Sequence, residues 1–209
     1  MINIEMFIEG SMPILLHRAT EEDLTGKTRV NAAQEQDDPR TICDGHIYRM
    51  PNSKQIALPG AAFARLAREA GGNHKVKGSR KSLKYLVPAA IVIMDDLCPF
   101  FLRDRKTPIV DFEVDARPVT IPATKGKVMR YRARLNEWVA RVNIRLNEGL
   151  ISEIQARDLF REGGQQIGVG DFRPEKGGPF GIWSIVSWLN TSEIKQTPAR
   201  ARNGARAEA

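Results

Sequence analysis

The sequence predicts an α+β fold with an antiparallel sheet, built in the order strand, helix, strand, strand, helix, strand (βαββαβ). Three observations predict it. Apolar residues alternate with polar ones over residues 2–8, two segments at 59–71 and 151–167 have helical spacing, and residues 110–146 read as extended structure. Two helices on one face of a four-stranded sheet define a ferredoxin-like (RRM-like) core.

The length of 209 residues suits one domain, and a hydrophobic content of 42% is enough for a packed core. The core order is interrupted at about 19–55 and 72–127, where we expect large insertions. At the end of the chain, residues 199–209 are rich in alanine and hold three arginines against one acid. We therefore expect one ferredoxin-like domain over 1–198, followed by a basic, disordered tail.

Two apolar segments supply the first core strands. In the first, the alternating residues are Ile2, Ile4, Met6 and Ile8, and a second apolar run follows at 14–16 after a break at 10–13. The second segment, 85–101, predicts a buried strand and then a turn at Asp95 and Asp96. Neighbouring carboxylates on a strand face opposite ways, so we expect a polar strand end and no metal site.

Both helices have one apolar stripe. The first begins near Pro59 and ends at Gly71, with Phe63, Leu66, Ala67 and Ala70 on its inner face. The second has a capping box of Ser152 and Gln155, and its stripe is formed by Ala156, Leu159, Phe160, Gly163 and Ile167. Because glycine weakens a helix, Gly163 and Gly164 indicate either close packing or an early helix end.

The extended segment carries a face of arginines. Met129, Tyr131, Ala133 and Leu135 share one face of a strand, and Arg130, Arg132 and Arg134 share the other. After Asn136 and Glu137 the phase reverses, so that Trp138, Ala140, Val142, Ile144 and Leu146 face inward and Arg141, Asn143 and Arg145 outward. This reversal predicts a tight hairpin or a bulge between two antiparallel strands, with few acids to neutralise the arginines.

The charge balance favours a polyanionic partner. Lysine and arginine number 32 against 25 acids, which gives a net charge of +7. The densest basic run has no acid and comprises Lys75, Lys77, Arg80, Lys81 and Lys84. Such a run suits contacts with phosphates, because the cations displace condensed counterions, although a solvated basic loop would have the same composition.

A glycine-rich segment follows the second helix and precedes the last strand. Its glycines are Gly168, Gly170, Gly177, Gly178 and Gly181, and Arg173 and Lys176 lie among them as phosphate donors. Glycines permit positive φ and let a ligand backbone come close. The segment lacks the GK[ST] of a phosphate-binding loop and precedes a strand instead of opening a helix, so we expect no nucleotide cofactor.

The two cysteines, Cys43 and Cys98, lie 55 positions apart without metal-ligand spacing, so we expect buried free thiols and no zinc. The first residues, MINIEMFIEG, include two acids where a signal peptide would be basic, and no apolar run approaches the length of a membrane span. The sequence therefore predicts a cytoplasmic protein without cofactors, without metal and without a membrane partner.

Two stretches resemble a known family. The loop GVGDFRPEKGGPFG is similar to the glycine-rich loop of the RAMP superfamily, and ALPGAAFARLAREA resembles the turn into the first helix of its CRISPR backbone subunits. The match covers two motifs and the element order. Ala61 and Ala62 stand where the family offers serines, and Arg65 matches its basic residue loosely. The loop also resembles small proteins of bacteriophages and mobile elements.

The resemblance implies a non-catalytic subunit that binds guide RNA or single-stranded nucleic acid and stacks into a filament with copies of itself and other effector subunits. A long insertion, 72–127 or 19–55, would act as a thumb between nucleotides. Three alternatives stay open. One is a metal-independent endoribonuclease of the same superfamily, for which His17, His46 and above all His74 are candidate bases. The others are a phage accessory or structural protein and a single-strand annealing protein.

Overall fold

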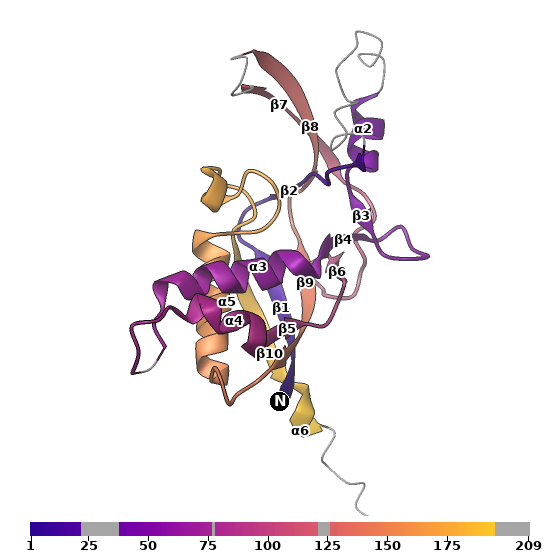
Figure 1. The fold of residues 1–209 in the computed structure, drawn as a ribbon. Coiled ribbons are helices and arrows are strands. Elements are labelled where there is room, and N and C mark those ends of the chain that lie inside the picture. Colours follow the sequence, from indigo (N-terminus) through magenta and orange to yellow (C-terminus); the bar gives the residue numbers. More distant parts are fainter. Residues whose placement is uncertain (22–37, 77, 121–125, 195–209) are drawn as a thin grey trace, which may run out of the picture.

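The computed structural model describes residues 1–21, 38–76, 78–120 and 126–194. The fold is α+β with two antiparallel sheets (Figure 1). The larger sheet has seven strands: β1 (Ile2–Gly10), β3 (Tyr48–Arg49), β4 (Ile56–Pro59), β5 (Ile91–Ile93), β6 (Leu97–Phe101), β9 (Val139–Leu146) and β10 (Trp183–Asn190). The smaller sheet has three: β2 (Ile14–Leu16), β7 (Glu113–Thr120) and β8 (Lys127–Leu135).

The predicted ferredoxin-like core is confirmed by the strand pairing. β1 lies between β10 and β9, and β9 pairs on its other side with β5 and β6. The helix α3 (Gly60–Ala70) connects the first half of this core, and α5 (Glu153–Gln166) connects β9 to β10. Both helices cover the same face of the sheet (Figure 1). The core order is therefore β1, α3, β5, β9, α5, β10.

The helix α5 follows its predicted pattern closely. Ser152 and Gln155 form the capping box at its start. The helix continues through Gly163 and Gly164 to Gln166, so the glycines serve close packing and do not end it. A Cβ on Gly163 would overlap Leu66 of α3, and one on Gly164 would lie 2.7 Å from the carbonyl oxygen of Trp183. These two glycines let α5 approach α3 and β10 at the same level.

In the segment 85–101 the strand before the predicted turn is shorter than the sequence predicts and covers only Ile91–Ile93. A short helix, α4 (Val87–Ala90), precedes β5, because Pro88 fixes a helical φ in the first turn and provides no N–H for a ladder. The predicted turn at Asp95 and Asp96 separates β5 from β6. Asp95 accepts hydrogen bonds from the backbone N and the side-chain Nδ2 of Asn143, at 2.8 and 3.0 Å, so it has a structural role.

The predicted hairpin at Asn136 and Glu137 is wrong. β8 pairs with β2 and β7, whereas β9 pairs with β1, β5 and β6, so the chain leaves one sheet for the other at this point. The phase reversal reflects that change of sheet. Trp138 anchors the crossing: its Nε1 donates to the Met12 carbonyl oxygen at 3.0 Å, and its ring packs edge-on against Phe100.

The hairpin of β7 and β8 projects beyond the core (Figure 1). Its base is buried, with Ala133 and Leu135 in the core. Met129, predicted to face the core, is 52% exposed, since the outer part of the hairpin extends past the core that would cover it. The arginines predicted beside these residues belong to the hairpin as well.

Several further elements lie in the two predicted insertions. The stretch 19–55 holds α2 (Pro39–Gly45) and β3, and 72–127 holds η3 (Leu83–Tyr85), α4, β6 and β7 besides the core strand β5. The other short helices are η2 (Gly71–Asn73), η4 (Pro174–Lys176) and α6 (Thr191–Ile194). The predicted tail at 199–209 lies outside the described residues. None of the helices in the described ranges has the length and apolar composition of a membrane span.

The packing of α5 predicts the effect of an added methyl group. We expect Gly164→Ala to lower the free energy of unfolding by about 1–3 kcal/mol, because the new Cβ would crowd the Trp183 backbone and ring. Gly72→Ala is the matched control, since a Cβ there meets nothing within 4 Å. Urea unfolding of both variants tests this prediction, and equal stabilities would contradict it.

Candidate functional site

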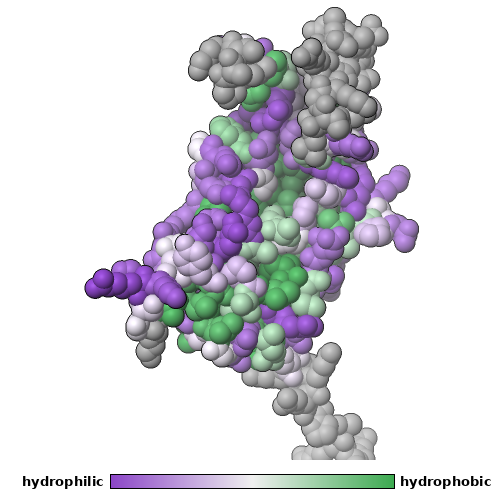
Figure 2. Space-filling view, in the orientation of Figure 1, coloured by the Kyte–Doolittle hydropathy of each residue, from purple (hydrophilic) through white to green (hydrophobic). Residues whose placement is uncertain are grey.

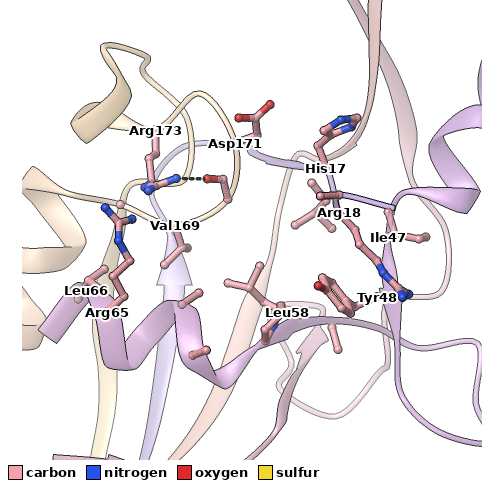
Figure 3. A pocket seen from close by; sticks show the side chains of 18 of the residues that line it. His17, Arg18, Ile47, Tyr48, Leu58, Arg65, Leu66, Val169, Asp171 and Arg173 are labelled. Carbon is pink, nitrogen blue, oxygen red and sulfur yellow. Dashed lines mark hydrogen bonds between the residues drawn. The ribbon is translucent and has the colours of Figure 1, made fainter. Parts of the chain in front are cut away.

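A cavity of about 440 Å³ opens between the glycine-rich loop, the start of α3, residues 16–19 and residues 46–48 (Figure 3). Its floor is apolar and includes Leu16, Leu58, Leu66 and Val169. Its polar lining includes His17, Arg18, His46, Tyr48, Arg65, Asp171 and Arg173. In Figure 3, Arg65 and Arg173 lie on one side of the cavity, and Arg18 and Tyr48 on the other. The site therefore combines an apolar base with a cationic and aromatic border.

The glycine-rich loop has the backbone geometry that its composition predicts. Positive φ values occur at Gly168, Gly170, Gly177 and Gly181. Gly178 has no positive φ, but a Cβ there would overlap the Phe172 carbonyl. The conformation of the loop therefore explains why each of these five positions is a glycine, and no ligand is needed for that explanation.

The loop is fixed to its surroundings by backbone hydrogen bonds. Val169 N–H donates to Gly181 O at 3.0 Å, which closes the loop on itself. Gly181 N–H donates to Pro13 O at 2.8 Å, and Asp171 N–H donates to Leu15 O at 2.7 Å. One wall of the cavity is therefore held against the chain that runs from β1 into β2.

The start of α3 faces the cavity without a side-chain cap. Pro59 occupies the N-cap position, where it makes no side-chain hydrogen bond, and the first turn holds no acid. Gly60 N–H donates to Asp96 O at 2.8 Å, and a Cβ on Gly60 would overlap the Asp95 carbonyl. Ala61 and Ala62 line the cavity. This helix end presents partial positive charge to the cavity.

Arg65 and Arg173 share one carboxylate, that of Glu175. Arg65 Nη2 lies 2.5 Å and Arg173 Nη2 lies 2.6 Å from the two oxygens of Glu175. Burial opposes ionisation of Glu175, but the hydrogen bonds and charges of the two arginines outweigh it and lower the pKa of the carboxyl. Arg173 Nη1 also donates to the Gly170 carbonyl at 2.9 Å. The group of three carries a net charge of +1.

A second ion pair connects the loop to the hairpin. Arg132 Nε lies 2.5 Å from Asp171 Oδ2, and Arg132 is only 5% exposed. Burial opposes ionisation of Asp171, yet the hydrogen bond and charge of Arg132 lower the pKa of this carboxyl. The prediction that Arg132 faces solvent is therefore wrong, because an acid distant in sequence pairs with it.

Two stacked histidines, His17 and His46, form part of the cavity lining. The sequence alone does not indicate that they lie together. The rings of His17 and His46 are parallel within 3°, with centroids 4.7 Å apart. His46 Nδ1 donates to the Ile42 carbonyl at 2.7 Å. His17 Nδ1 is buried and has no hydrogen-bond partner among the described residues. Burial, then the charges of His46 and the nearby Arg130, lower the pKa of His17 to about 4.

Tyr48 and Arg18 complete the aromatic side. The Arg18 guanidinium lies over the Tyr48 ring, 4.8 Å from its centroid. Such a contact holds both groups in one orientation. His46 and Tyr48 come from the insertion at 19–55, and His17 and Arg18 follow β2, so no sequence motif joins the four residues. Only the fold brings them together.

The basic run lies at the other end of α3 from the cavity. Lys75, Arg80 and Lys81 are exposed, whereas Lys84 forms an ion pair with Glu69 at 2.6 Å. Lys77 lies outside the described residues. Because α3 has 11 residues, its two ends lie about 16 Å apart. His74 also lies here, with Nε2 2.8 Å from Glu162 Oε2.

The other predicted cations are divided between the hairpin and the loop. Arg130 is exposed, and Arg134 Nε donates to Asn136 Oδ1 at 2.7 Å. Glu113 stands opposite Arg134 in the pairing of β7 with β8, and Asp115 stands opposite Arg132. These are acids that the sequence pattern did not assign to the arginine face. Lys176 is exposed at the end of η4. The predicted cations thus form three groups: the run after α3, the hairpin, and the glycine-rich loop.

Neither cysteine lines the cavity. Both are buried free thiols, as predicted. Burial raises the pKa of Cys43 to about 11 and that of Cys98 to about 12, so both remain protonated at neutral pH.

The low pKa of His17 predicts a loss of stability in weak acid. The unfolded chain takes up a proton near pH 6.5, but the folded chain only near pH 4. As the pH falls between these values, we expect the free energy of unfolding to decrease by about 2 kcal/mol, with no effect above pH 7. Chemical denaturation between pH 4 and 7 should show this slope in the native chain and in His74→Asn, and a reduced slope in His17→Asn. An unchanged slope in His17→Asn would contradict the prediction.

Comparisons with known proteins give a likeness in structure and none in sequence. No protein-family model matches the sequence, and no curated protein matches it. Among solved structures, the fold is similar to Cmr6 from Pyrococcus furiosus, with 9% sequence identity and a TM-score of 0.46 over 88% of this chain and 97% of that one. A likeness at this identity and TM-score does not extend to residues or ligands.

Proposed function

We propose that the protein binds single-stranded nucleic acid, with RNA as the expected form, at the cavity between the glycine-rich loop and α3. The binding is non-catalytic, and the protein serves as a repeated subunit of a CRISPR-type ribonucleoprotein. The observation that carries the proposal is the uncapped start of α3, which faces a mouth bordered by Arg18, Arg65 and Arg173. Helix starts and arginines are the groups that proteins place against phosphates.

The charges around the cavity suit a polyanionic ligand, such as a strand with one phosphate per nucleotide. Arg18 and Arg130 add to the net positive charge of the Arg65, Arg173 and Glu175 group, while Arg132 and Asp171 cancel one another. Arg130 and Lys176 are exposed on the hairpin and the loop to either side. A strand that passes the mouth of the cavity would meet cations before and after it.

The hairpin of β7 and β8 suits the part of a thumb that the RAMP resemblance implies. It projects beyond the core and is joined to the glycine-rich loop through Arg132 and Asp171. In a filament, the hairpin of one protomer would reach the strand held by its neighbour. The exposed cations after α3, Lys75, Arg80 and Lys81, would then contact a different stretch of the same strand.

His74, the base that the endoribonuclease alternative prefers, does not line the cavity. His74 contacts Glu162 at the end of α3 that faces away from the cavity. We expect single-stranded RNA to be recovered intact after binding, which gel electrophoresis of the recovered RNA would check. Cleavage in the absence of metal, lost in a His17→Asn or His46→Asn variant, would favour the alternative.

The proposed function predicts salt-dependent binding of single strands. Fluorescence anisotropy with labelled RNA and DNA oligonucleotides should show tighter binding of single strands than of duplexes. The logarithm of the association constant should fall linearly with the logarithm of salt concentration, by about 0.7 for each phosphate contact. Absence of binding at physiological salt would contradict the proposal. It would favour the alternative in which the basic surface binds an acidic protein.

Substitution of Arg65 distinguishes a direct phosphate contact from the effect of the protein's overall positive charge. We expect Arg65→Gln to weaken binding of all sequences alike and to reduce the salt slope by about one contact. Arg157→Gln is the control, since Arg157 is an exposed arginine on α5 that does not line the cavity. Equal affinities of the two variants would exclude Arg65 as a phosphate contact.

Substitution of Glu175 should change the affinity for single strands in the opposite direction from substitution of Arg65. The Glu175 carboxylate neutralises part of Arg65 and Arg173, so Glu175→Gln should free both guanidinium groups for phosphates. We expect this variant to bind single strands several-fold more tightly at low salt, with the difference shrinking as salt rises. Weaker binding by this variant would show that Glu175 positions the arginines and that its charge does not compete with phosphates.

A further inference from the structure

We propose that the cavity holds one nucleobase, turned out of the bound strand, with the phosphate of the same nucleotide at the mouth between Arg65 and the start of α3. This inference rests on the proposed function and assigns a ligand group to its site. A phosphate is bound well by exposed cations and needs no apolar recess. The structure has such a recess, about 440 Å³ with Leu16, Leu58 and Val169 in its floor.

The floor and the sides of the cavity match the two kinds of surface on a base. A base has apolar faces and a polar edge, and proteins bind unstacked bases by stacking on aromatic rings or guanidinium planes. The cavity presents Tyr48 with Arg18 and the paired rings of His17 and His46. Figure 3 shows Tyr48 and Arg18 across the cavity from Arg65 and Arg173. An apolar floor and aromatic sides are of little use to a phosphate or a carboxylate.

The histidine pair is built for stacking and not for binding an anion. A base that binds next to the pair would extend an existing stack of parallel rings. Because the pKa of His17 is about 4, its ring is uncharged at neutral pH. The hydrogen bond from His46 Nδ1 to the Ile42 carbonyl fixes the orientation of the second ring. His17 Nδ1 has no such bond within the described residues, so the fold does not account for this polar atom.

The mouth supplies the charge that the interior lacks. Arg65 and Arg173 lie at the glycine-loop side, where a phosphate attached to the inserted base would emerge, and the first turn of α3 also lines the cavity. Arg65 is about 43% exposed at its side chain and can exchange Glu175 for a phosphate. One nucleotide would thus have its base and its phosphate held by different groups of residues, which makes the two contacts separable by mutation.

The three histidines of the chain provide a direct test. His17 and His46 line the cavity, and His74 lies at the far end of α3 as an internal control. Histidine ring NMR signals, assigned through single His→Asn variants, would be followed while AMP, UMP or ribose 5-phosphate is added. We expect AMP or UMP to shift the signals of His17 and His46 and to leave His74 unchanged. Ribose 5-phosphate, which has no base, should leave all three unchanged.

A variant pair tests the stacking contact in the whole strand. Tyr48→Leu should weaken binding of single-stranded RNA about tenfold without changing the salt slope, because a ring is lost and no charge. Tyr48→Phe keeps the ring and should bind as the native chain does. Urea unfolding of both variants establishes that the folded state is retained.

The outcomes separate this inference from the function on which it rests. If RNA binds with the expected salt slope but nucleotides move neither His17 nor His46 and Tyr48→Leu binds normally, the base pocket is refuted and the proposed function stands. If nucleotides shift the two signals but RNA strands do not bind, the pocket stands and the proposed function fails. Equal shifts with AMP and ribose 5-phosphate would assign the cavity to the phosphate and overturn the inference.

Discussion

The ion pair of Arg132 with Asp171 holds the glycine-rich loop against the smaller sheet beside the cavity. It joins the hairpin of the smaller sheet to the glycine-rich loop, and Arg132 is almost completely buried. A buried ion pair adds little net stability, but removal of one partner leaves a charge that the interior cannot solvate, at a cost of about 3–5 kcal/mol. The pair therefore constrains geometry: the loop cannot move away from β8 without exposing or isolating a charge.

The constraint explains why the loop can present its own backbone and two arginines in a fixed arrangement. Asp171 is held by Arg132 from the hairpin and by Leu15 O through its backbone N–H, while Gly181 is held by Pro13. Arg65 of α3 then meets Arg173 of the loop across Glu175. The helix, the loop and the smaller sheet are thus connected by charged and backbone contacts around the cavity, and the apolar core lies beneath them.

The core was predictable because its signals are periodic and local. Alternation at period two gave β1 and β9, the stripe and capping box gave α5, and the stripe after Pro59 gave α3. Errors arose where a local pattern has two explanations. A phase reversal at Asn136 fits a hairpin or a change of sheet, and the apolar stretch around Pro88 fits a strand or a short helix before one.

The site was predictable only in part, because its residues are separated in sequence. The glycine-rich loop and Arg173 were recognised by composition. His17, His46 and Tyr48 have no shared spacing, and their proximity depends on how β2 and the insertion fold back on α3. The burial of Arg132 depends on Asp171, 39 positions later. Pairing between distant charges is not encoded in any local pattern.

Trp138 has a mechanical consequence. Trp138 lies in the short segment between β8 and β9. Its indole N–H donates to the Met12 carbonyl, its ring packs against Phe100, and its backbone carbonyl accepts a hydrogen bond from Gly10 N–H at 2.9 Å. The projecting hairpin is therefore continuous with a central strand of the core through a rigid joint instead of a flexible linker. A force on the described part of β8 is therefore transmitted through Trp138 directly to β9 and, by the Gly10 hydrogen bond, to β1.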